Sequence, residues 1–236
     1  MKFSSPLILG HLVRRYKRFL ADCILADGTM ITAHCPNTGA MLGCAEPGSR
    51  VWLSRSHNPK RKYSLTWEIV EVNSEIRVGI NTNRANHLVQ EAIVTGKIPA
   101  LRGYERIRRE VRFGQEGSRV DLLLERDGSC PCYIEVKNVT AAPSNGIAIF
   151  PDAVTVRGTR HLRELSYIVE NHARGVIFFC VQRPDIHEVR PADTIDPDYG
   201  KALRAALANG VEAMAWRTRI DDEEIELTCM LPVVCP

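Results

Sequence analysis

The chain has 236 residues, of which 44% are hydrophobic and 25% charged, and it carries a net charge of +3. This composition is typical of a globular protein with one large or two modest cores, and it argues against a disordered or fibrous chain. No apolar run approaches the ~20 residues that a membrane helix needs, and the opening MKFSSPLILG lacks the long apolar segment of a signal peptide, so we expect a cytoplasmic protein outside the membrane.

The first ~80 residues contain short strand-like runs separated by turn signals such as Asp27-Gly28 and Pro47-Gly48. The expected strands cover residues 7–15, 19–26, 29–35, 50–55 and 64–72, with an extension at 76–80. Five short antiparallel strands are typical of an oligonucleotide/oligosaccharide-binding (OB) barrel, so we predict an OB-like domain at residues 1–80.

A second unit begins near residue 81 with a helix. In NRANHLVQEAIVTG, residues 83–96, apolar side chains recur on one helical face and Gly96 ends the helix. The elements that follow predict an α/β (α+β) domain with a mixed central sheet at residues 81–236. They are strands at 105–113, 118–124 and 132–137, a helix at 157–171, a strand at 175–182, a helix at 197–210, and strands at 211–219 and 224–231.

Positive charge is concentrated in the first quarter of the chain. Residues 1–63 carry ten Lys or Arg and three Asp or Glu, a net charge of +7, so the remainder of the +3 chain carries −4. A basic module joined to a mildly acidic one suggests that the first module binds a polyanion.

The eight cysteines are scattered along the chain and form no CxxC pair. The only close pair, Cys130 and Cys132, has no second pair and no nearby histidine to complete a zinc site. Others, such as Cys180 in VIFFCV, lie in apolar runs where a thiol behaves as a small hydrophobe. We therefore predict free, structural thiols.

The stretch YIEVKN, residues 133–138, places Glu135 and Lys137 two positions apart on one face of a strand. The preceding turn is centred on Gly128, so residues equidistant from Gly128 face each other in a regular hairpin, and Asp121 lies opposite Glu135. The same alternation predicts one polar and one apolar face. The polar face carries Arg119, Asp121, Glu135 and Lys137, and the apolar face carries Val120, Leu122, Leu124, Ile134 and Val136.

Two facing carboxylates repel unless a cation lies between them. A divalent ion held by both, with water completing the shell, is a common way to bind Mg²⁺. Lys137 could then orient or deprotonate an attacking water and neutralise charge on a phosphorane. Alternatively, Lys137 and Arg119 only neutralise the two acids on a solvated sheet face, and the pattern alone leaves both interpretations open.

Six blocks occur in order along the chain: RYKRFLAD (15–22), HCPNTGAM (34–41), NPKRK (58–62), EVKNVT (135–140), FPDAVT (150–155) and RGTRHLREL (157–165). Together they resemble the sugar fermentation stimulation protein A family almost from end to end. The resemblance implies an N-terminal OB barrel and a C-terminal domain similar to PD-(D/E)XK nucleases. It also implies DNA binding and a link to the regulation of sugar utilisation, maltose in particular.

Carried over by position, the resemblance assigns catalytic roles to Asp121, Glu135 and Lys137. It assigns metal binding to Asp121 and Glu135, with Mg²⁺ or Mn²⁺ as the cofactor. Glu91, on the first helix of the second domain, is the candidate for an additional metal-binding acid. The letters PD in PD-(D/E)XK denote a proline directly before the first aspartate. In this chain the residue before Asp121 is Val120, a departure that the superfamily tolerates.

Basic residues of the predicted barrel alternate with aromatic ones, which offers charges for phosphates and rings for base stacking. A second basic cluster is expected on a loop that can follow a nucleic-acid backbone. The predicted nucleic-acid-binding residues are Arg14, Arg15, Tyr16, Lys17, Arg18, Lys60, Arg61 and Lys62. His34, Asn37 and Thr38 lie in a turn and receive no role.

Three functions fit the sequence. The first is a largely sequence-tolerant DNA-binding protein with a nuclease-type site, which makes it a Mg²⁺- or Mn²⁺-dependent DNA endonuclease. The second is a DNA-binding regulator whose nuclease-like domain is an inactive scaffold, and the third is a sugar-sensing barrel protein. The sequence does not fix the oligomeric state and leaves a homodimer open.

Overall fold

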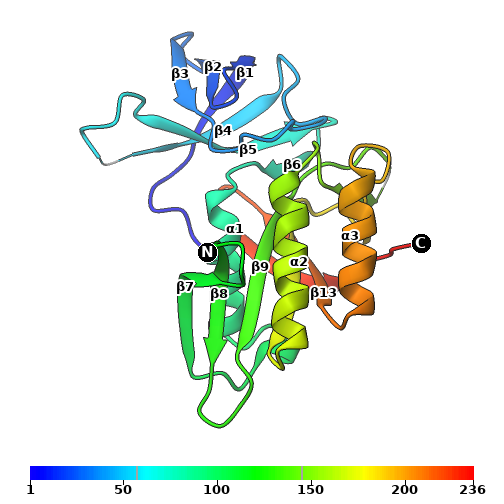
Figure 1. Ribbon diagram of the computed structural model, residues 1–236. Coiled ribbons are helices and arrows are strands. Elements are labelled where there is room, and N and C mark those ends of the chain that lie inside the picture. The colour runs from blue at the N-terminus through cyan, green and yellow to red at the C-terminus, as the bar shows by residue number, and fades with distance from the viewer. Residues whose placement is uncertain (57, 145) are drawn as a thin grey trace.

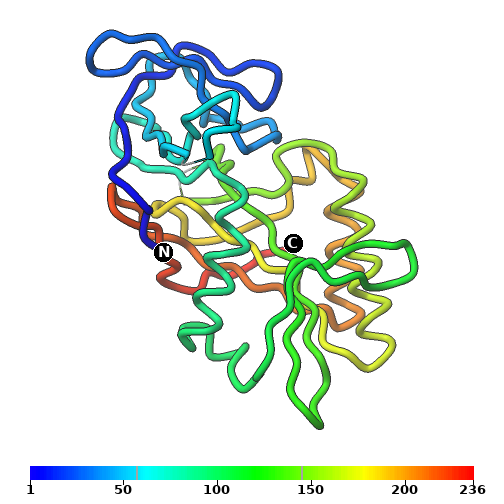
Figure 2. Tube along the Cα trace, turned by 90° about the vertical axis from the view of Figure 1, so that its left-hand side faces the viewer, coloured from blue at the N-terminus to red at the C-terminus, as the bar shows by residue number. Residues whose placement is uncertain are grey.

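The first domain is a closed barrel of short strands at one end of the molecule (Figures 1 and 2). The computed structural model describes residues 1–56, 58–144 and 146–236. The strands are β1 (Ile8–Tyr16), β2 (Leu20–Leu25), β3 (Met30–His34), β4 (Arg50–Arg55), β5 (Leu65–Val72) and β6 (Ile76–Gly79). They hydrogen-bond in the order β3-β2-β1-β4-β5-β6, and a pairing of β3 with β5 closes the barrel. The predicted OB-like barrel is confirmed, with every strand within one residue of its expected bounds.

Local chemistry explains the turn between β2 and β3 and the barrel centre. Gly28 has a φ of +82°, a backbone conformation that side chains disfavour, and the Asp27 carboxylate accepts a 2.9 Å hydrogen bond from the Thr29 N–H. Trp67 is completely buried, and its indole N–H donates to the Ile69 carbonyl at 2.9 Å. The barrel therefore has a core of its own.

The second domain is a mixed sheet with helices on both faces (Figure 1). Its elements are α1 (Asn83–Val94), β7 (Arg106–Phe113), β8 (Ser118–Glu125), β9 (Cys132–Val139), α2 (Val156–Glu170), β11 (Arg174–Val181), α3 (Pro197–Ala208), β13 (Glu212–Ile220) and β14 (Ile225–Leu231). The strand order is β14-β13-β11-β9-β8-β7, with β9, β11 and β13 parallel and the other neighbours antiparallel. The predicted order of helix, three strands, helix and strand is confirmed, and so is the α/β class with a mixed central sheet.

The sequence pattern missed three short elements. They are a 3₁₀ turn (Pro99–Leu101), β10 (Ile147–Phe150) and β12 (Glu188–Pro191). β10 and β12 form a parallel pair apart from the main sheet. Such short strands carry little periodicity, and this pair depends on contact between segments far apart in the chain, so no local signal marks it.

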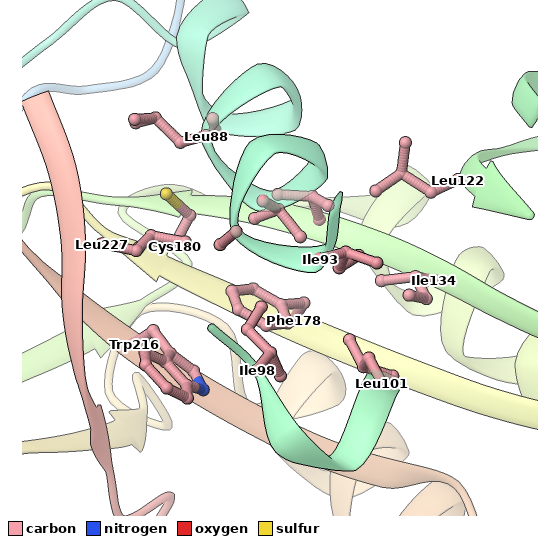
Figure 3. Close-up of a cluster of buried hydrophobic side chains, with 14 of the residues drawn as sticks. Leu88, Ile93, Ile98, Leu101, Leu122, Ile134, Phe178, Cys180, Trp216 and Leu227 are labelled. Carbon is pink, nitrogen blue, oxygen red and sulfur yellow. The ribbon is translucent and has the colours of Figure 1, made fainter. Parts of the chain in front are cut away.

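Strand β11 is buried on both faces, as its uninterrupted apolar run predicts. Phe178 packs beneath α1 with Leu88 and Ile93 (Figure 3). The next residue, Phe179, packs in the cluster that α2 and α3 cover, together with Leu165. The central sheet is therefore packed between two hydrophobic cores, one on each face.

The hairpin of β8 and β9 has the register predicted around Gly128. Leu122 pairs with Ile134 and Leu124 with Cys132. The paired stretch ends at Leu122, and the Val136 N–H donates instead to the Asp121 carboxylate at 2.7 Å. The backbone ladder therefore ends just before the two acids, which leaves room between them.

One prediction about the faces of this hairpin was wrong, and one of the two open interpretations is excluded. Val120 packs on the α2 side with Leu123, and not with Leu122 and Ile134 on the α1 side. The face that carries Glu135 is not solvated, because α2 covers it and Glu135 is only 3% exposed. Regular alternation fails where β8 ends its pairing with β9, which explains the position of Val120. The burial of Glu135 excludes the interpretation that this acid lies on a solvated sheet face.

A buried glutamate joins the barrel to the second domain. Glu68 on β5 is 2% exposed, and its carboxylate accepts hydrogen bonds from Ser54 at 2.6 Å, Asn81 at 2.8 Å and Arg84 at 2.6 Å. Arg84 lies on the first turn of α1, so this cluster ties the barrel to the helix that covers the sheet. A buried carboxylate with a bonded cation and two further donors is well compensated.

We expect Arg84→Ala to lower the free energy of unfolding by about 2–3 kcal/mol, because it leaves the Glu68 carboxylate buried without its cation. Arg106→Ala is the matched control, since Arg106 pairs with Asp127 where the two side chains are 62% and 84% exposed. Its loss should cost less than about 1 kcal/mol. Urea unfolding followed by circular dichroism measures both variants, and equal midpoints would contradict the structural role of Glu68.

The cysteines are all free, as predicted, and five of them are buried. Burial raises the pKa of Cys180 to about 12, so this thiol stays protonated. Across residues 1–56, 58–144 and 146–236, no group of three or more His, Cys, Asp or Glu side chains is arranged to hold a metal. Over the same residues, no helix is both long and apolar enough to span a membrane.

Candidate metal and phosphodiester site

Asp121, Glu135 and Lys137 converge on a cleft of about 410 Å³ between the two domains. The sheet supplies this triad, and the first residues of α1 and α2 supply further walls. The barrel closes the cleft with a loop that follows β3. The other lining residues are Asn37, Thr38, Gly39, Thr82, Asn83, Ala85, Asn86, Val136, Asn138, Thr140, Phe150, Asp152, Thr155, Arg157 and Gly158.

Glu135 lies at the bottom of this cleft and is held by two cationic or hydrogen-bonding partners. Its Oε1 accepts a 2.7 Å bond from Lys137 Nζ and also contacts Nδ1 of the buried His161. Burial raises the pKa of Glu135, but Lys137 and His161 outweigh this effect and hold the pKa below its usual range. Glu135 is therefore ionised, and its buried Oε2 has no hydrogen-bond partner among the described residues.

Asp121 is positioned by one side chain and one backbone amide. Asn86 Nδ2 donates to Oδ1 at 2.7 Å, and the Val136 N–H donates to Oδ2 at the same distance. Burial, and secondly the negative charge of Glu135, raise the pKa of Asp121 to about 6. The two acids repel each other in the same cleft, and a cation bound between them would remove this repulsion.

The donor set fits a hard divalent cation. Glu135 Oε2 is a buried acceptor without a partner among the described residues, in a cleft that a second carboxylate also lines, and a cation there would satisfy this oxygen and offset the charge of both acids. With two carboxylates as the protein donors, water and substrate oxygens must complete the shell, which is usual for Mg²⁺ and Mn²⁺. Zn²⁺ sites instead take three or four protein ligands, and the described residues provide no such group.

Glu91 does not join this site, so the prediction of an additional metal-binding acid needs correction. Its carboxylate binds the Met1 ammonium at 2.9 Å in a separate pocket that Lys97 also lines. Asn86 is the α1 residue that reaches Asp121. Glu91 follows Asn86 by five positions, a rotation of about 140° around a helix of 3.6 residues per turn, and so faces elsewhere.

Asn86 should therefore control metal binding through Asp121. We expect Asn86→Ala to weaken Mn²⁺ binding by about 10- to 100-fold, the usual effect of removing a group that orients a metal ligand. Asn83→Ala is the matched control, because Asn83 is an exposed residue of the same helix that lines the cleft. Isothermal titration calorimetry with Mn²⁺ measures both, and an equal effect in the two variants would contradict this role for Asn86.

Two of the predicted nucleic-acid-binding arginines hold the barrel loop. Arg15 Nη2 donates to the carbonyls of Asn37 at 3.0 Å and Gly39 at 2.8 Å, and Arg18 donates to the Thr38 carbonyl at 2.8 Å. This use of their donors follows from the loop's carbonyls, which point at the β1–β2 turn. Arg15 and Arg18 thus support a wall of the cleft, a role that the sequence pattern did not predict.

The remaining basic residues divide between paired and exposed positions. Arg14 binds Asp22 at 2.9 Å, and the Tyr16 hydroxyl donates to the same carboxylate at 3.1 Å. Arg61 donates to the Thr66 hydroxyl at 3.1 Å. Lys17, Lys60 and Lys62 are exposed, and Lys62 Nζ lies over the Tyr63 ring at 5.5 Å from its centroid.

The loop that follows β3 lines the cleft, although the sequence pattern assigns it no role. The Met41 N–H donates to Asp152 at 2.9 Å, which ties the loop to the segment before α2. A side chain at Gly39 would place its Cβ 2.7 Å from an Asp152 oxygen, so the close approach requires glycine. The block HCPNTGAM marks the loop, but its contact with Asp152 is tertiary and has no local signal.

His161 is a second feature of the site, after the loop that follows β3, to which the sequence assigns no role. The crowding of Arg157, Arg160, His161 and Arg163 at the start of α2 indicates a helix near the site, and the structure places His161 on Glu135. Nothing in the spacing alone distinguishes it from its charged neighbours.

An OB-type barrel joined to an α/β domain with a mixed sheet, with two acids and a lysine in the cleft between them, defines a two-domain α/β protein with a candidate metal site. The family model described as "SfsA N-terminal OB domain" matches residues 13–80, and "Sugar fermentation stimulation protein RE domain" matches residues 83–224. The chain belongs to the sugar fermentation stimulation protein (SfsA) family, as its sequence blocks predicted.

Relatives match over the whole chain. The sugar fermentation stimulation protein homolog of Alkalilimnicola ehrlichii is 59% identical over 238 residues, covering 100% of both chains. The homolog of Geobacter sulfurreducens is 57% identical over 234 residues, covering 99% of both. The structure of Pyrococcus furiosus SfsA in complex with Ca²⁺ superposes with a TM-score of 0.89 at 26% identity, covering 99% of this chain and 98% of that one.

Proposed function

We propose that this protein binds DNA and hydrolyses its phosphodiester bonds with Mg²⁺ or Mn²⁺. The observation that carries the proposal is the pair of half-buried Asp121 and buried Glu135, with one Glu135 oxygen that has no partner among the described residues and with Lys137 Nζ 2.7 Å from the other Glu135 oxygen. Burying two acids together is costly unless a cation offsets their charge. Ca²⁺ bound to the Pyrococcus furiosus relative is consistent with a divalent ion in this family.

Each residue of the site has a distinct role in this proposal. Asp121 and Glu135 would hold the cation, which would supply positive charge to the scissile phosphate and lower the pKa of a water. Lys137 lies beside Glu135, where its ammonium can orient the attacking water and neutralise charge on the phosphorane. Asn86 and His161 position the two carboxylates.

The barrel supplies the electrostatic part of DNA binding in this proposal. Lys17, Lys60 and Lys62 are exposed on the net-positive domain and can contact phosphates. We place the protein in the cytoplasm, where such a DNA-binding protein would meet its substrate. The family name supports a link to sugar utilisation, and we extend it to the regulation of maltose genes as part of this proposal.

Cleavage of purified DNA tests the proposal. We expect nicking of supercoiled plasmid and cleavage of circular single-stranded DNA in Mn²⁺, with loss of both activities in Asp121→Ala. Asp127→Ala, which changes an aspartate that is 84% exposed, is the matched control and should remain active. Equal residual cleavage by all three proteins would indicate a contaminant and would exclude the proposed activity.

A second candidate is a DNA-binding regulator that keeps the nuclease-like domain as a scaffold. The direct bond between Lys137 and Glu135 favours it, because the ammonium already neutralises the acid that a metal would need. This candidate predicts binding that weakens steeply with salt and no cleavage with either metal. The third interpretation, a sugar-sensing barrel, predicts heat on titration with maltose.

A further inference from the structure

We propose that the strand bound in the cleft is single-stranded DNA, with a phosphate at the acidic pair and unpaired bases against an apolar rim. The inference rests on the proposed function and specifies its substrate. It follows from three features: a recessed Glu135 carboxylate, a fixed barrel loop that lines the same cleft, and exposed apolar side chains next to residues that line or support the cleft wall.

The Glu135 carboxylate and the lysine bonded to it are recessed. The Glu135 side chain is 4% exposed and that of Lys137 is 11% exposed. The cleft of about 410 Å³ is of the size that encloses a small ligand, and both domains wall it. One nucleotide unit fits such a space, whereas a duplex offers its phosphates on a surface that carries grooves ~12 Å and ~6 Å wide. A flexible single strand can place one phosphate at the bottom without opening a helix.

The barrel wall is held in place by contacts from both domains. Arg15 and Arg18 bind the carbonyls of the loop from the barrel side. From the second domain, the Thr82 hydroxyl donates to the Pro36 carbonyl at 2.9 Å, and Asp152 accepts from the Met41 N–H at 2.9 Å. Hydrogen bonds from both domains therefore fix the position of this cleft wall.

Two exposed valines adjoin a residue of the cleft wall. Val154 is 71% exposed and Val156 is 80% exposed, on either side of Thr155, which lines the cleft. Thr155 is held firmly: it accepts a 3.0 Å bond from the Gly158 N–H, and its own N–H donates to Asp196 at 2.7 Å. The two valines are thus presented on a fixed segment, where an apolar surface needs a partner.

The opposite domain presents a ring near the cleft wall. Phe19 is 46% exposed and follows Arg18, which binds the Thr38 carbonyl. Bases stacked in a duplex hide their faces, whereas a single strand offers them to rings and apolar side chains. Exposed Lys17 beside the ring and Arg157 in the cleft provide charges for the phosphates between those bases.

Fluorescence anisotropy with the full chain tests the inference. The probes are a labelled oligonucleotide, alone or annealed to its complement, in buffer with Ca²⁺. We expect the single strand to bind at least about tenfold more tightly than the duplex. Replacing both valines, Val154→Ser with Val156→Ser, should weaken single-strand binding about fivefold and leave duplex binding unchanged. Phe19→Ala should weaken single-strand binding about tenfold.

Two variants control for general surface effects. Val94→Ser changes a valine of α1 that is 69% exposed, and Met30→Ala changes an apolar residue of the barrel that is 64% exposed. Both should bind the single strand as the unaltered protein does. Equal affinity for duplex and single strand, or equal losses in the rim variants and the controls, would overturn the inference.

The outcome is separable from that of the proposed function. A single-strand preference that depends on the rim, together with absence of cleavage in Mn²⁺, would reject the nuclease activity and keep the binding specificity. Cleavage of relaxed duplex circles as fast as single-stranded circles would keep the nuclease and reject the single-strand substrate.

Discussion

Glu135→Gln is expected to reduce metal-dependent cleavage of DNA by about 10³-fold. The substitution keeps the size of the side chain but removes the negative charge that a divalent cation needs. An amide in this position can leave an NH₂ group where Oε2 now lies without a partner among the described residues. It also removes the charge that Lys137 neutralises at 2.7 Å, so the lysine loses its fixed position.

Glu164→Gln is the matched control for this substitution. Glu164 is also buried, at 2% exposure, but it accepts hydrogen bonds from the N–H groups of Gln115 and Glu116 and does not line the cleft. Cleavage rates in Mn²⁺ and calorimetric Mn²⁺ binding should fall together in Glu135→Gln and stay near the unaltered values in the control. Tight Mn²⁺ binding by Glu135→Gln would show that the metal is held elsewhere.

The parts of the site that the sequence predicted are those that depend on local geometry. The register of Leu122 with Ile134 follows from the position of Gly128 in the turn, because a short hairpin leaves little freedom of pairing. That register brings Asp121 near Glu135. Alternation then misplaced Val120, since β8 leaves the ladder and its next residues no longer follow a period of two.

The parts that the sequence could not predict depend on contacts between distant segments. Helical periodicity identified the buried face of α1 but not its rotation relative to β8, which decides that Asn86 and not Glu91 reaches Asp121. In the same way, the basic sequence around Arg15 is typical of a phosphate-binding segment. In the structure, its guanidinium donates to the loop carbonyls of Asn37 and Gly39, which no local pattern indicates.

Domain docking explains why the cleft itself was missed. The barrel and the sheet each follow from local patterns, but their contact depends on Gly39 lying against Asp152, residues more than one hundred positions apart. A glycine in a polar turn most often permits a backbone conformation, and here it also permits close approach of two domains. The site is therefore a property of both domains, although its acids come from one.

Lys137→Gln should separate catalysis from metal binding. We expect cleavage to fall by about 10²- to 10⁴-fold, because the ammonium that orients water and neutralises the phosphorane is lost. Mn²⁺ binding should stay the same or become tighter, since Lys137 no longer competes with the cation for the Glu135 carboxylate. Opposite directions in the two measurements would distinguish this residue from Glu135, whose loss lowers both.

Lys97→Gln is the matched control, because Lys97 forms an ion pair with Glu226 in a separate pocket of the same domain. It should leave cleavage and Mn²⁺ binding unchanged. The Lys137 result also decides between the two candidate functions. If the unaltered protein does not cleave and Lys137→Gln binds Mn²⁺ at least tenfold more tightly, the ammonium occupies the cation's place and the domain is a scaffold. If the unaltered protein cleaves and the variant binds Mn²⁺ but does not cleave, Lys137 acts in catalysis.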